Sequence, residues 1–230
     1  RDLHSFPTRR SSDLHIAGVD VAVLEVGLGG RFDATNVVMP MACAVTTISL
    51  DHQEYLGTTL SSIAFEKAGI IKPGVPVVLG RLEDDAWRMI EQVARERQAP
   101  VFRLNEDFRT EGEGPQQFSY RGLGMQYDGL ICALKGRHQL DNAACALALL
   151  EAAAPQGIAV TAEAVSAALR GVNWAGRLEV VDRRPTILLD GAHNPAAATA
   201  LADYLTRSDR SHPSRPVVLV LGMKIGRAHV

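Results

Sequence analysis

Carboxylate and imidazole side chains follow two apolar runs of the kind that form buried strands. Glu25 lies near the end of the run 19–26, directly before the glycine-rich turn 27–31, and His52 follows the run 42–49. Ligands gather at the carboxyl ends of strands in open α/β sheets, so an acid beside a glycine turn is suited to hold a metal next to phosphate groups. A solvated acid and a hydrogen-bonded loop histidine are the simpler alternatives. The turn is not GxGxxG and does not predict dinucleotide binding.

Three further ionisable residues lie at the ends of predicted helices. Lys67 is near the end of a helix expected over 60–68, where a cation complementing the helix dipole, a contact that stabilises by about 0.3–1 kcal/mol, is a sufficient explanation. Asp190 and His193 flank a strand-to-helix turn in which Asn194 before a proline has the pattern of an N-cap. The cap needs only Asn194, so the other two groups are candidates for contact with an anion or a nucleotide. No HExxH or CxxC motif is present.

Strand and helix patterns alternate along the chain. Trp87, Ile90 and Ala94 share one face of a helix over 84–97, whereas 105–124 holds few large apolar residues and is expected to be a surface excursion. Alternation of this kind favours parallel βαβ units, so we predict an α/β fold with a mostly parallel sheet. The expected strands are 19–26, 42–49, 75–79, 101–104, 126–134, 186–189 and 216–221, and the expected helices are 60–68, 84–97, 139–153, 161–170 and one that begins at Pro195 and ends before a polar loop at 208–215.

The composition narrows the class of protein. The chain has 230 residues, of which 47% are hydrophobic and 22% charged, with a formal net charge of -2. These values favour a folded chain of one large domain, or one domain and a piece of a second, and give no support for a nucleic-acid partner. No run approaches the roughly 18 apolar residues that span a bilayer. Three cysteines, Cys43, Cys132 and Cys145, lie in apolar runs and indicate a reduced, cytoplasmic protein without disulfides or a zinc site.

The two ends of the chain differ in character from the rest. Residues 4–14 resemble the conceptual translation of a sequencing-library adapter, and 225–230 resemble that of the opposite adapter. We therefore expect 1–14 and 224–230 to be artefacts and the natural chain to run over 15–223. A boundary is expected near Arg183-Arg184-Pro185, which divides the chain into a first domain at 15–183 and the start of a second at 184–223.

Six short segments include all of the candidate site residues named above, from Glu25 to His193. They are 24–36 (LEVGLGGRFDATN), 48–52 (ISLDH), 65–70 (FEKAGI), 136–143 (GRHQLDNA), 174–177 (WAGR) and 190–195 (DGAHNP). Each is modest alone, but six in one order are specific. Over 19–223 the chain resembles the folylpolyglutamate synthase/dihydrofolate synthase family of the Mur-ligase superfamily, and its bacterial bifunctional branch most of all.

The resemblance implies an ATP-dependent carboxylate–amine ligase. Its substrates would be ATP, L-glutamate and dihydropteroate or folate, and the γ-phosphate would activate the pterin substrate's carboxylate as an acyl phosphate. The implied fold is an incomplete P-loop-type ATPase domain followed by the start of a Rossmann-like domain. The family's glycine-rich phosphate loop, with its Lys and Ser/Thr, lies N-terminal to Glu25 and is not found in this chain, so we expect it in sequence that precedes residue 15. We expect a cytoplasmic monomer that binds neither nucleic acid nor membrane.

The resemblance also implies roles for individual residues. Glu25 and His52 match magnesium ligands, and Lys67 matches a lysine that carbon dioxide carbamylates. A carbamate is a carboxylate-like oxygen ligand for Mg²⁺, whereas a free ammonium would repel the metal.

The remaining implied roles concern the substrates. Asn142, Arg177 and Asp190 match positions that contact ATP. His193 matches a residue near the phosphates and the incoming glutamate, and Phe32 matches a position in the pterin site. A guanidinium such as that of Arg177 would place a fixed positive charge near the phosphates.

Two other interpretations stay open. Another ligase of the same superfamily, acting on a cell-wall precursor, would share the metal and ATP chemistry, although a different sequence would be expected around 190–195. A non-catalytic nucleotide-binding protein is the alternative from another class.

Overall fold

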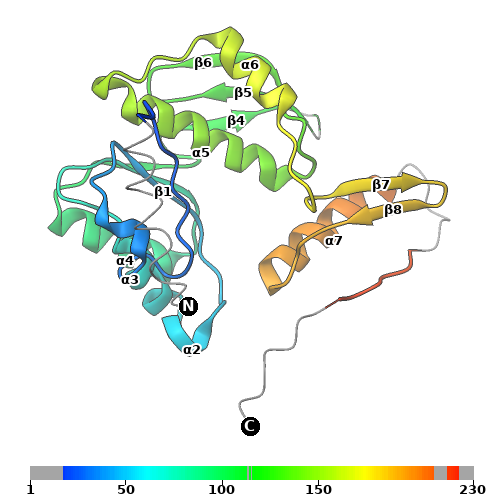
Figure 1. Cartoon of the computed structure of the whole chain (residues 1–230), viewed down its shortest axis with the longest axis horizontal. Coiled ribbons are helices and arrows are strands. Elements are labelled where there is room, and N and C mark those ends of the chain that lie inside the picture. The colour runs from blue at the N-terminus through cyan, green and yellow to red at the C-terminus, as the bar shows by residue number, and fades with distance from the viewer. Residues whose placement is uncertain (1–17, 113, 115, 210–216, 223–230) are drawn as a thin grey trace.

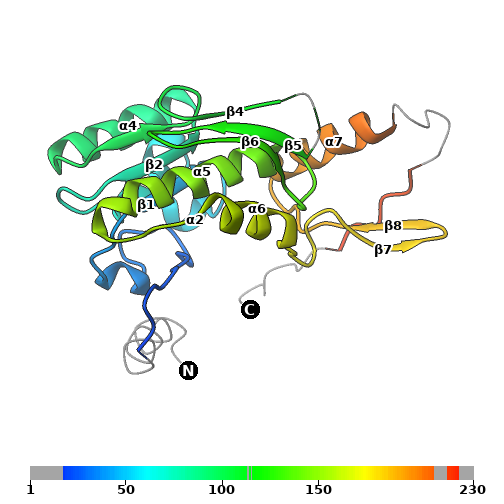
Figure 2. The same cartoon turned by 90° about the horizontal axis from the view of Figure 1, so that it is seen from above.

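The computed structural model describes residues 18–112, 114, 116–209 and 217–222, and within them the strands form three sheets. The adapter-like segments 1–14 and 224–230 lie outside the described residues. Figures 1 and 2 show that the third sheet and its helix stand to one side of the first two sheets and the helix between them. None of the described helices is long and apolar enough to cross a bilayer.

The first sheet is parallel, with strand order β1-β2-β3. Val77 of the central strand pairs with Cys43 on one side and with Val101 on the other. Helices connect successive strands, which confirms the predicted βαβ units. The elements are β1 (Cys43–Thr47), α2 (Gln53–Leu56), α3 (Leu60–Ala68), β2 (Val77–Arg81), α4 (Asp84–Glu96) and β3 (Val101–Arg103).

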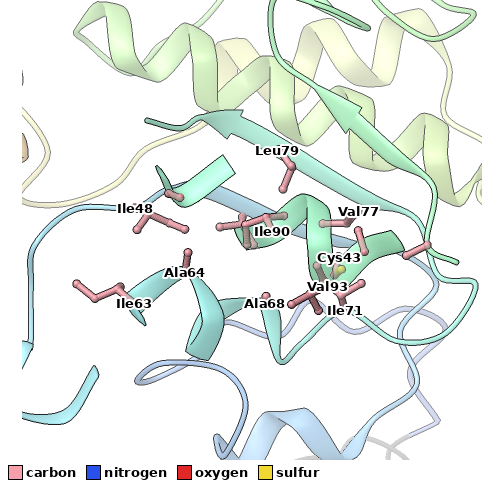
Figure 3. Packing of buried hydrophobic residues seen from close by; sticks show 14 of the residues in the cluster. Cys43, Ile48, Ile63, Ala64, Ala68, Ile71, Val77, Leu79, Ile90 and Val93 are labelled. Atoms are coloured by element: carbon pink, nitrogen blue, oxygen red, sulfur yellow. The ribbon is translucent and has the colours of Figure 1, made fainter. Parts of the chain in front are cut away.

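Local sequence explains where these helices begin and what they bury. α3 begins at a capping box, in which the Thr59 hydroxyl accepts a hydrogen bond from the Ser62 amide at 3.1 Å and the Ser62 hydroxyl accepts one from the Thr59 amide at 3.2 Å. α4 carries two acidic residues in its first turn, which complement the helix dipole. Figure 3 shows side chains of α3 and α4, including the fully buried Ile63 and Ile90, packed against the strands.

The second sheet is antiparallel, with order β4-β5-β6. α5 packs between this sheet and the first one, so the buried side chain of Val78 on β2 belongs to the same core cluster as Leu140 on α5. The predicted helices 139–153 and 161–170 are confirmed, and the Thr161 hydroxyl caps the second one. The elements are β4 (Arg109–Glu111), β5 (Gln117–Arg121), β6 (Gln126–Ile131), α5 (Arg137–Ala153), η3 (Ala154–Gln156) and α6 (Ala162–Gly171).

The expectation of a surface excursion over 105–124 was wrong. β4 and β5 lie within it, and Phe108, Phe118 and Tyr120 are at most 2% exposed. Few large apolar residues are present there, but Phe118 and Tyr120 alternate with polar residues and therefore point to one face of the sheet. The low average hydrophobicity concealed this two-residue period.

The third sheet is the hairpin of β7 (Glu179–Arg183) and β8 (Thr186–Leu189), followed by α7 (Pro195–Asp209). The predicted strand 186–189 is confirmed, and its partner β7 was not predicted. The boundary expected between 183 and 184 falls in the turn that joins these two paired strands. α7 continues two residues into the loop expected over 208–215, and residues 210–215 lie outside the described part of the chain.

Two predicted strands are not formed. Residues 19–26 form no strand and pair with no described strand, and Val23 is 93% exposed. Residues 217–221 form no strand either and their side chains are exposed, while residue 216 is not described. An apolar run becomes a strand only where a neighbouring strand accepts its hydrogen bonds, and no strand among the described residues pairs with either segment.

Candidate active site

A polar cavity of about 240 Å³ lies at the carboxyl end of β1. Ligands of open α/β sheets bind at this end of the strands. The glycine turn forms one wall, the end of β1 and the start of α2 form another, and α3 and the start of α7 complete it. Half of the lining residues are polar or charged: Thr47, Ser49, Asp51, His52, Lys67 and Asn194.

Asp33 holds the glycine turn in shape. One oxygen of its carboxylate accepts hydrogen bonds from the amides of Gly27 at 3.0 Å and Leu28 at 3.1 Å. The other oxygen accepts from the amide and the hydroxyl of Thr35, at 2.9 and 2.6 Å, where the short helix η2 (Ala34–Val37) begins. Burial raises the pKa of Asp33, but these four hydrogen bonds outweigh it and the pKa is lowered.

The turn packs tightly on the end of α3. The Arg31 amide donates to the Glu66 carbonyl at 2.8 Å, and a Cβ at Gly30 would lie 3.0 Å from the Lys67 carbonyl oxygen. A Cβ at Gly69 would overlap the backbone of Arg31. Glycine at these positions therefore allows the turn to lie directly against the helix that carries Lys67.

The three residues predicted to hold magnesium are brought together only in part. His52 and Lys67 line the same cavity. Glu25 is exposed and does not line it, although the next residue, Val26, does. Among the described residues the Lys67 ammonium has no hydrogen-bond or ion-pair partner, so none of them neutralises its charge.

The donor atoms of the cavity fit a hard divalent cation in combination with other ligands. No three His, Cys, Asp or Glu side chains among the described residues lie close enough to hold a metal together. Mg²⁺ usually keeps several waters and is held by one or two carboxylates together with substrate phosphates, so few protein ligands are needed. Thr47 and Ser49, whose side chains carry hydroxyl oxygens, line the same cavity as His52. The residues present therefore fit a magnesium ion that also binds a nucleotide.

Asp51 is a site residue that sequence reasoning missed. It accepts hydrogen bonds from the Asn194 side-chain amide at 3.0 Å and from the His52 amide at 2.8 Å. Its oxygens also lie 3.8 Å from Nε2 of His52 and 3.7 Å from Nε2 of His193. The hydrogen bond from Asn194 is the largest cause of the lowered pKa of Asp51; burial opposes it, and the His52 amide and the two imidazoles add to it. A carboxylate directly before His52 was the available signal.

Asp190 fixes the turn between β8 and α7. Its two oxygens accept hydrogen bonds from the amides of Leu178 and Ala192, each at 2.9 Å. The Gly191 amide donates to the Gly176 carbonyl at 2.8 Å, and a Cβ at Gly191 would lie 3.1 Å from Nη1 of Arg177. Arg177 and Asp190 thus lie near each other.

Asn142 joins this group through the first turn of α5. Its side chain donates to Gln139 at 3.1 Å, and Gln139 contacts His138 at 3.2 Å. Burial lowers the pKa of His138, the Asp190 and Asp141 carboxylates oppose this, and the Arg177 guanidinium adds to it. His138 was not predicted, and it lies near enough to Arg177 and Asp190 for their charges to influence its pKa.

The last two predicted residues are exposed. Nδ1 of His193 lies 2.9 Å from the Gly191 carbonyl, and its Nε2 faces Asp51. Phe32 is 82% exposed, and the Arg31 guanidinium lies 4.6 Å from its ring centroid and 5.0 Å from that of Phe65. Phe32 thus offers an open aromatic face beside the glycine turn.

The chain is similar to known proteins in both sequence and fold. A family model described as "Dihydrofolate synthetase, C-terminal domain" matches residues 174–229. The chain is 38% identical over 214 residues to a dihydrofolate synthase/folylpolyglutamate synthase of Bacillus subtilis, covering 90% of this chain and 49% of that protein. The chain spans about half the length of the curated relatives it matches.

Solved structures show the same likeness. A structure described as an FPGS–AMPPCP–folate complex superposes with a TM-score of 0.83 at 34% identity, over 89% of this chain and 50% of that one. The Mycobacterium tuberculosis folylpolyglutamate synthase complexed with ADP and AMPPCP gives a TM-score of 0.77 at 39% identity, over 85% of this chain and 46% of that one. With the fold, the six motifs and these relatives in agreement, the chain belongs to the dihydrofolate synthase/folylpolyglutamate synthase family.

Proposed function

We propose that the protein is part of an ATP-dependent ligase that joins L-glutamate to dihydropteroate or to a reduced folate. The observation that carries this proposal is the polar cavity at the carboxyl end of β1, into which segments far apart in the chain bring His52, Lys67 and Asn194. The structural relative described with both AMPPCP and folate supports a nucleotide and a folate as its occupants.

The reaction explains why charge must be gathered there. A carboxylate is a poor electrophile, so its oxygen first attacks the γ-phosphorus of ATP, which releases ADP and leaves an acyl phosphate. The amino group of glutamate then attacks the acyl carbon, an amide bond forms, and phosphate and a proton are released. Phosphoryl transfer depends on positioning and on neutralising charge more than on covalent help from the protein.

His52 and Glu25 would hold magnesium, together with Lys67 in its carbamylated form. When bound, the ion would supply positive charge that neutralises the charge developing on the phosphate oxygens. The Lys67 ammonium first loses a proton, and the neutral amine then joins the carbon of CO₂ and releases a second proton, so that a cation is replaced by a carbamate that offers oxygen ligands. The lack of a partner for the Lys67 ammonium among the described residues supports this modification.

The other predicted residues would serve the substrates. Asn142 lies on α5, Arg177 precedes β7 and Asp190 lies between β8 and α7. All three would contact ATP, with the Arg177 guanidinium beside its phosphates. Nε2 of His193 lies 3.7 Å from the carboxylate of Asp51, which lines the cavity. His193 would approach the phosphates and the incoming glutamate. The exposed ring of Phe32 would stack on the pterin.

Domain limits and cellular setting complete the proposal. Because β7 and β8 form one hairpin and the family model begins at residue 174, we place the boundary between the two domains before β7 rather than within the hairpin. Cys43, Cys132 and Cys145 are free and buried, which supports a reducing compartment such as the cytoplasm. We propose a monomer as the working unit.

The test is acceptor-dependent phosphate release by the protein translated from the natural reading frame that contains residues 15–223. ATP, Mg²⁺ and L-glutamate are supplied with dihydropteroate, tetrahydrofolate or a cell-wall precursor as acceptor. Stimulation by a pterin acceptor supports the proposal. Stimulation by the cell-wall precursor alone would establish the other Mur-type ligase, and nucleotide binding without phosphate release with any acceptor would establish the non-catalytic alternative.

A further inference from the structure

The strongest unassigned feature is the contact between Asp51 and Asn194, which lie 143 positions apart in the chain. Nδ2 of Asn194 donates to Oδ2 of Asp51 at 3.0 Å. Oδ1 of Asn194 accepts from the Ala197 amide at 2.9 Å and so caps α7. Both ends of the Asn194 amide are engaged, one by the helix and one by Asp51, which fixes the orientation of the side chain.

The Asp51 carboxylate is engaged on both oxygens as well. Oδ1 accepts from the His52 amide at 2.8 Å, and Oδ2 accepts from Asn194. Nε2 of His193 approaches Oδ2 to 3.7 Å while Nδ1 of the same ring lies against the Gly191 carbonyl at 2.9 Å. Asp51 therefore stands between the segment that carries His52 and the first turn of α7.

We propose that Asp51 is a positioning residue that fixes the start of α7 over the cavity lined by His52 and Lys67. Asp51 connects the segment that follows β1 to the start of α7. In this way it sets the distance between His193 and the cavity. The carboxylate does this by accepting hydrogen bonds with both oxygens rather than by binding a ligand of its own. Its consequence for catalysis rests on the proposed function, whereas its effect on geometry does not.

A reciprocal exchange of the two side chains isolates this contact. In Asn194→Asp one carboxylate oxygen can still cap α7, but the other faces the carboxylate of Asp51 and repels it. In the double variant D51N/N194D, the amide of the new asparagine donates to the new aspartate, while its carbonyl oxygen still accepts from the His52 amide. The contact is then restored with donor and acceptor reversed.

The readout is the distance between spin labels on cysteines introduced at Glu54 in α2 and Ala202 in α7, both of which are exposed. The native thiols are buried, and burial raises the pKa of Cys43 and Cys145 to about 12, so they compete poorly for the label. The measurement needs no turnover, so it separates failure of this inference from failure of the proposed function.

We expect one narrow distance distribution in the otherwise unchanged chain, loss of that distance in Asn194→Asp, and its return in D51N/N194D. The matched control is Asp85→Asn, which removes an exposed carboxylate paired with Arg88 and should leave the distribution as it was. If Asn194→Asp fails to fold, recovery of fold and distance in the double variant supports the proposal. An unchanged distance in Asn194→Asp, or a double variant that does not recover, would overturn it.

The catalytic consequence is checked on the protein with acceptor-dependent phosphate release. We expect Asn194→Asp to lower kcat and D51N/N194D to regain most of it, with the same order as the distance measurements. Recovery of the distance without recovery of kcat would contradict the role of Asp51 in positioning His193.

Discussion

The Asp33 carboxylate lies 3.0 Å from the amide nitrogen of Gly27, six residues earlier, and closes the glycine turn that forms one wall of the cavity. The same carboxylate accepts hydrogen bonds from Leu28 and from both donors of Thr35. Hydrogen bonds to a charged acceptor are the stronger kind, so one side chain organises the whole wall.

Replacing Asp33 with Asn should therefore destabilise the protein. An amide has one acceptor oxygen where the carboxylate has two, so either the turn amides or the Thr35 donors lose their partner. We expect the free energy of unfolding to fall by about 1–3 kcal/mol, the cost of leaving such groups unsatisfied. Urea denaturation measures this loss, and Asp85→Asn on the exposed face of α4 should change stability by less than about 0.5 kcal/mol. Equal effects of the two variants would contradict this role of Asp33.

The stability difference between the natural chain and Asp33→Asn should also depend on pH. The pKa of Asp33 in the folded protein lies below its ordinary value of 3.8, so the folded state binds this proton less readily than the unfolded state. Its contribution is therefore present above about pH 4 and is lost as the pH falls through the folded pKa. The stability difference between the natural chain and Asp33→Asn should shrink over that acid range, as urea titrations at successive pH values would show. A stability difference that stays constant over that pH range would show that the ionised form of Asp33 does not cause it.

Elements with a complete local signal could be predicted from the sequence. The capping pair Thr59 and Ser62 and the apolar face of α4 are contained in short segments, and both helices form where expected. The run 19–26 shows the limit of this reasoning, because its composition says nothing about whether another strand lies beside it. The prediction for 105–124 was wrong for a different reason, because the low average hydrophobicity of the segment hid the alternation of Phe118 and Tyr120 with polar residues.

Residue type and position predicted only part of the site. His52 was a candidate because an imidazole follows a predicted strand, whereas the role of Lys67 came only from the resemblance of its segment to the family, and the structure places both residues in one cavity. Asp51 was missed because its role depends on Asn194, 143 positions away, and no local pattern encodes that contact. Likewise, His138 acquires its surroundings from Asp190 and Arg177, which only the folded chain brings near it.

Adding a methyl group at Gly30 should separate the turn from α3. A Cβ there would lie 2.9 Å from Ile70 Cγ2 and about 3 Å from the carbonyl oxygens of Glu66 and Lys67, which are backbone atoms and cannot move aside cheaply. We expect Gly30→Ala to cost about 1–3 kcal/mol of stability. Gly171→Ala is the control, because nothing lies within 4 Å of its Cβ, and it should stabilise α6 by up to about 1 kcal/mol. Thermal unfolding of both variants checks this, and a neutral Gly30→Ala would show that the turn is loosely packed.

Carbamylation of Lys67 can be observed without turnover. With ¹³C-labelled bicarbonate and Mg²⁺, we expect a carbamate resonance in the carbon NMR spectrum of the natural chain and its loss in Lys67→Arg. Lys135→Arg is the control, since Lys135 donates to the Leu178 carbonyl away from the cavity, and its spectrum should keep the resonance. In the ligase assay Lys67→Ala should lose most activity and regain part of it when a small carboxylic acid is added. A resonance that survives in Lys67→Arg, or a Lys67→Ala variant with unchanged turnover, would remove the carbamate proposal.

Glu151 should be the main support of the turn between β5 and β6. Its Oε1 accepts from the Tyr120 hydroxyl at 2.6 Å and the Leu123 amide at 3.2 Å, and its Oε2 accepts from the amides of Gly124 and Met125, each at 2.7 Å. Burial is the main cause that raises the pKa of Tyr120, and the Glu151 carboxylate raises it further, so the phenol remains a donor across the neutral range.

Glu151→Gln puts an amide NH₂ where one pair of these donors needs an oxygen. We expect a loss of about 1–3 kcal/mol in unfolding free energy and faster hydrogen exchange at the amides of Gly124 and Met125. The control is Glu91→Gln, which breaks an exposed pair with Arg95 on α4 and should cost no more than about 0.5 kcal/mol. If both variants lose the same small amount and exchange in the turn is unchanged, the sheet rather than Glu151 holds the hairpin. A loss confined to Glu151→Gln assigns that role to the carboxylate on α5.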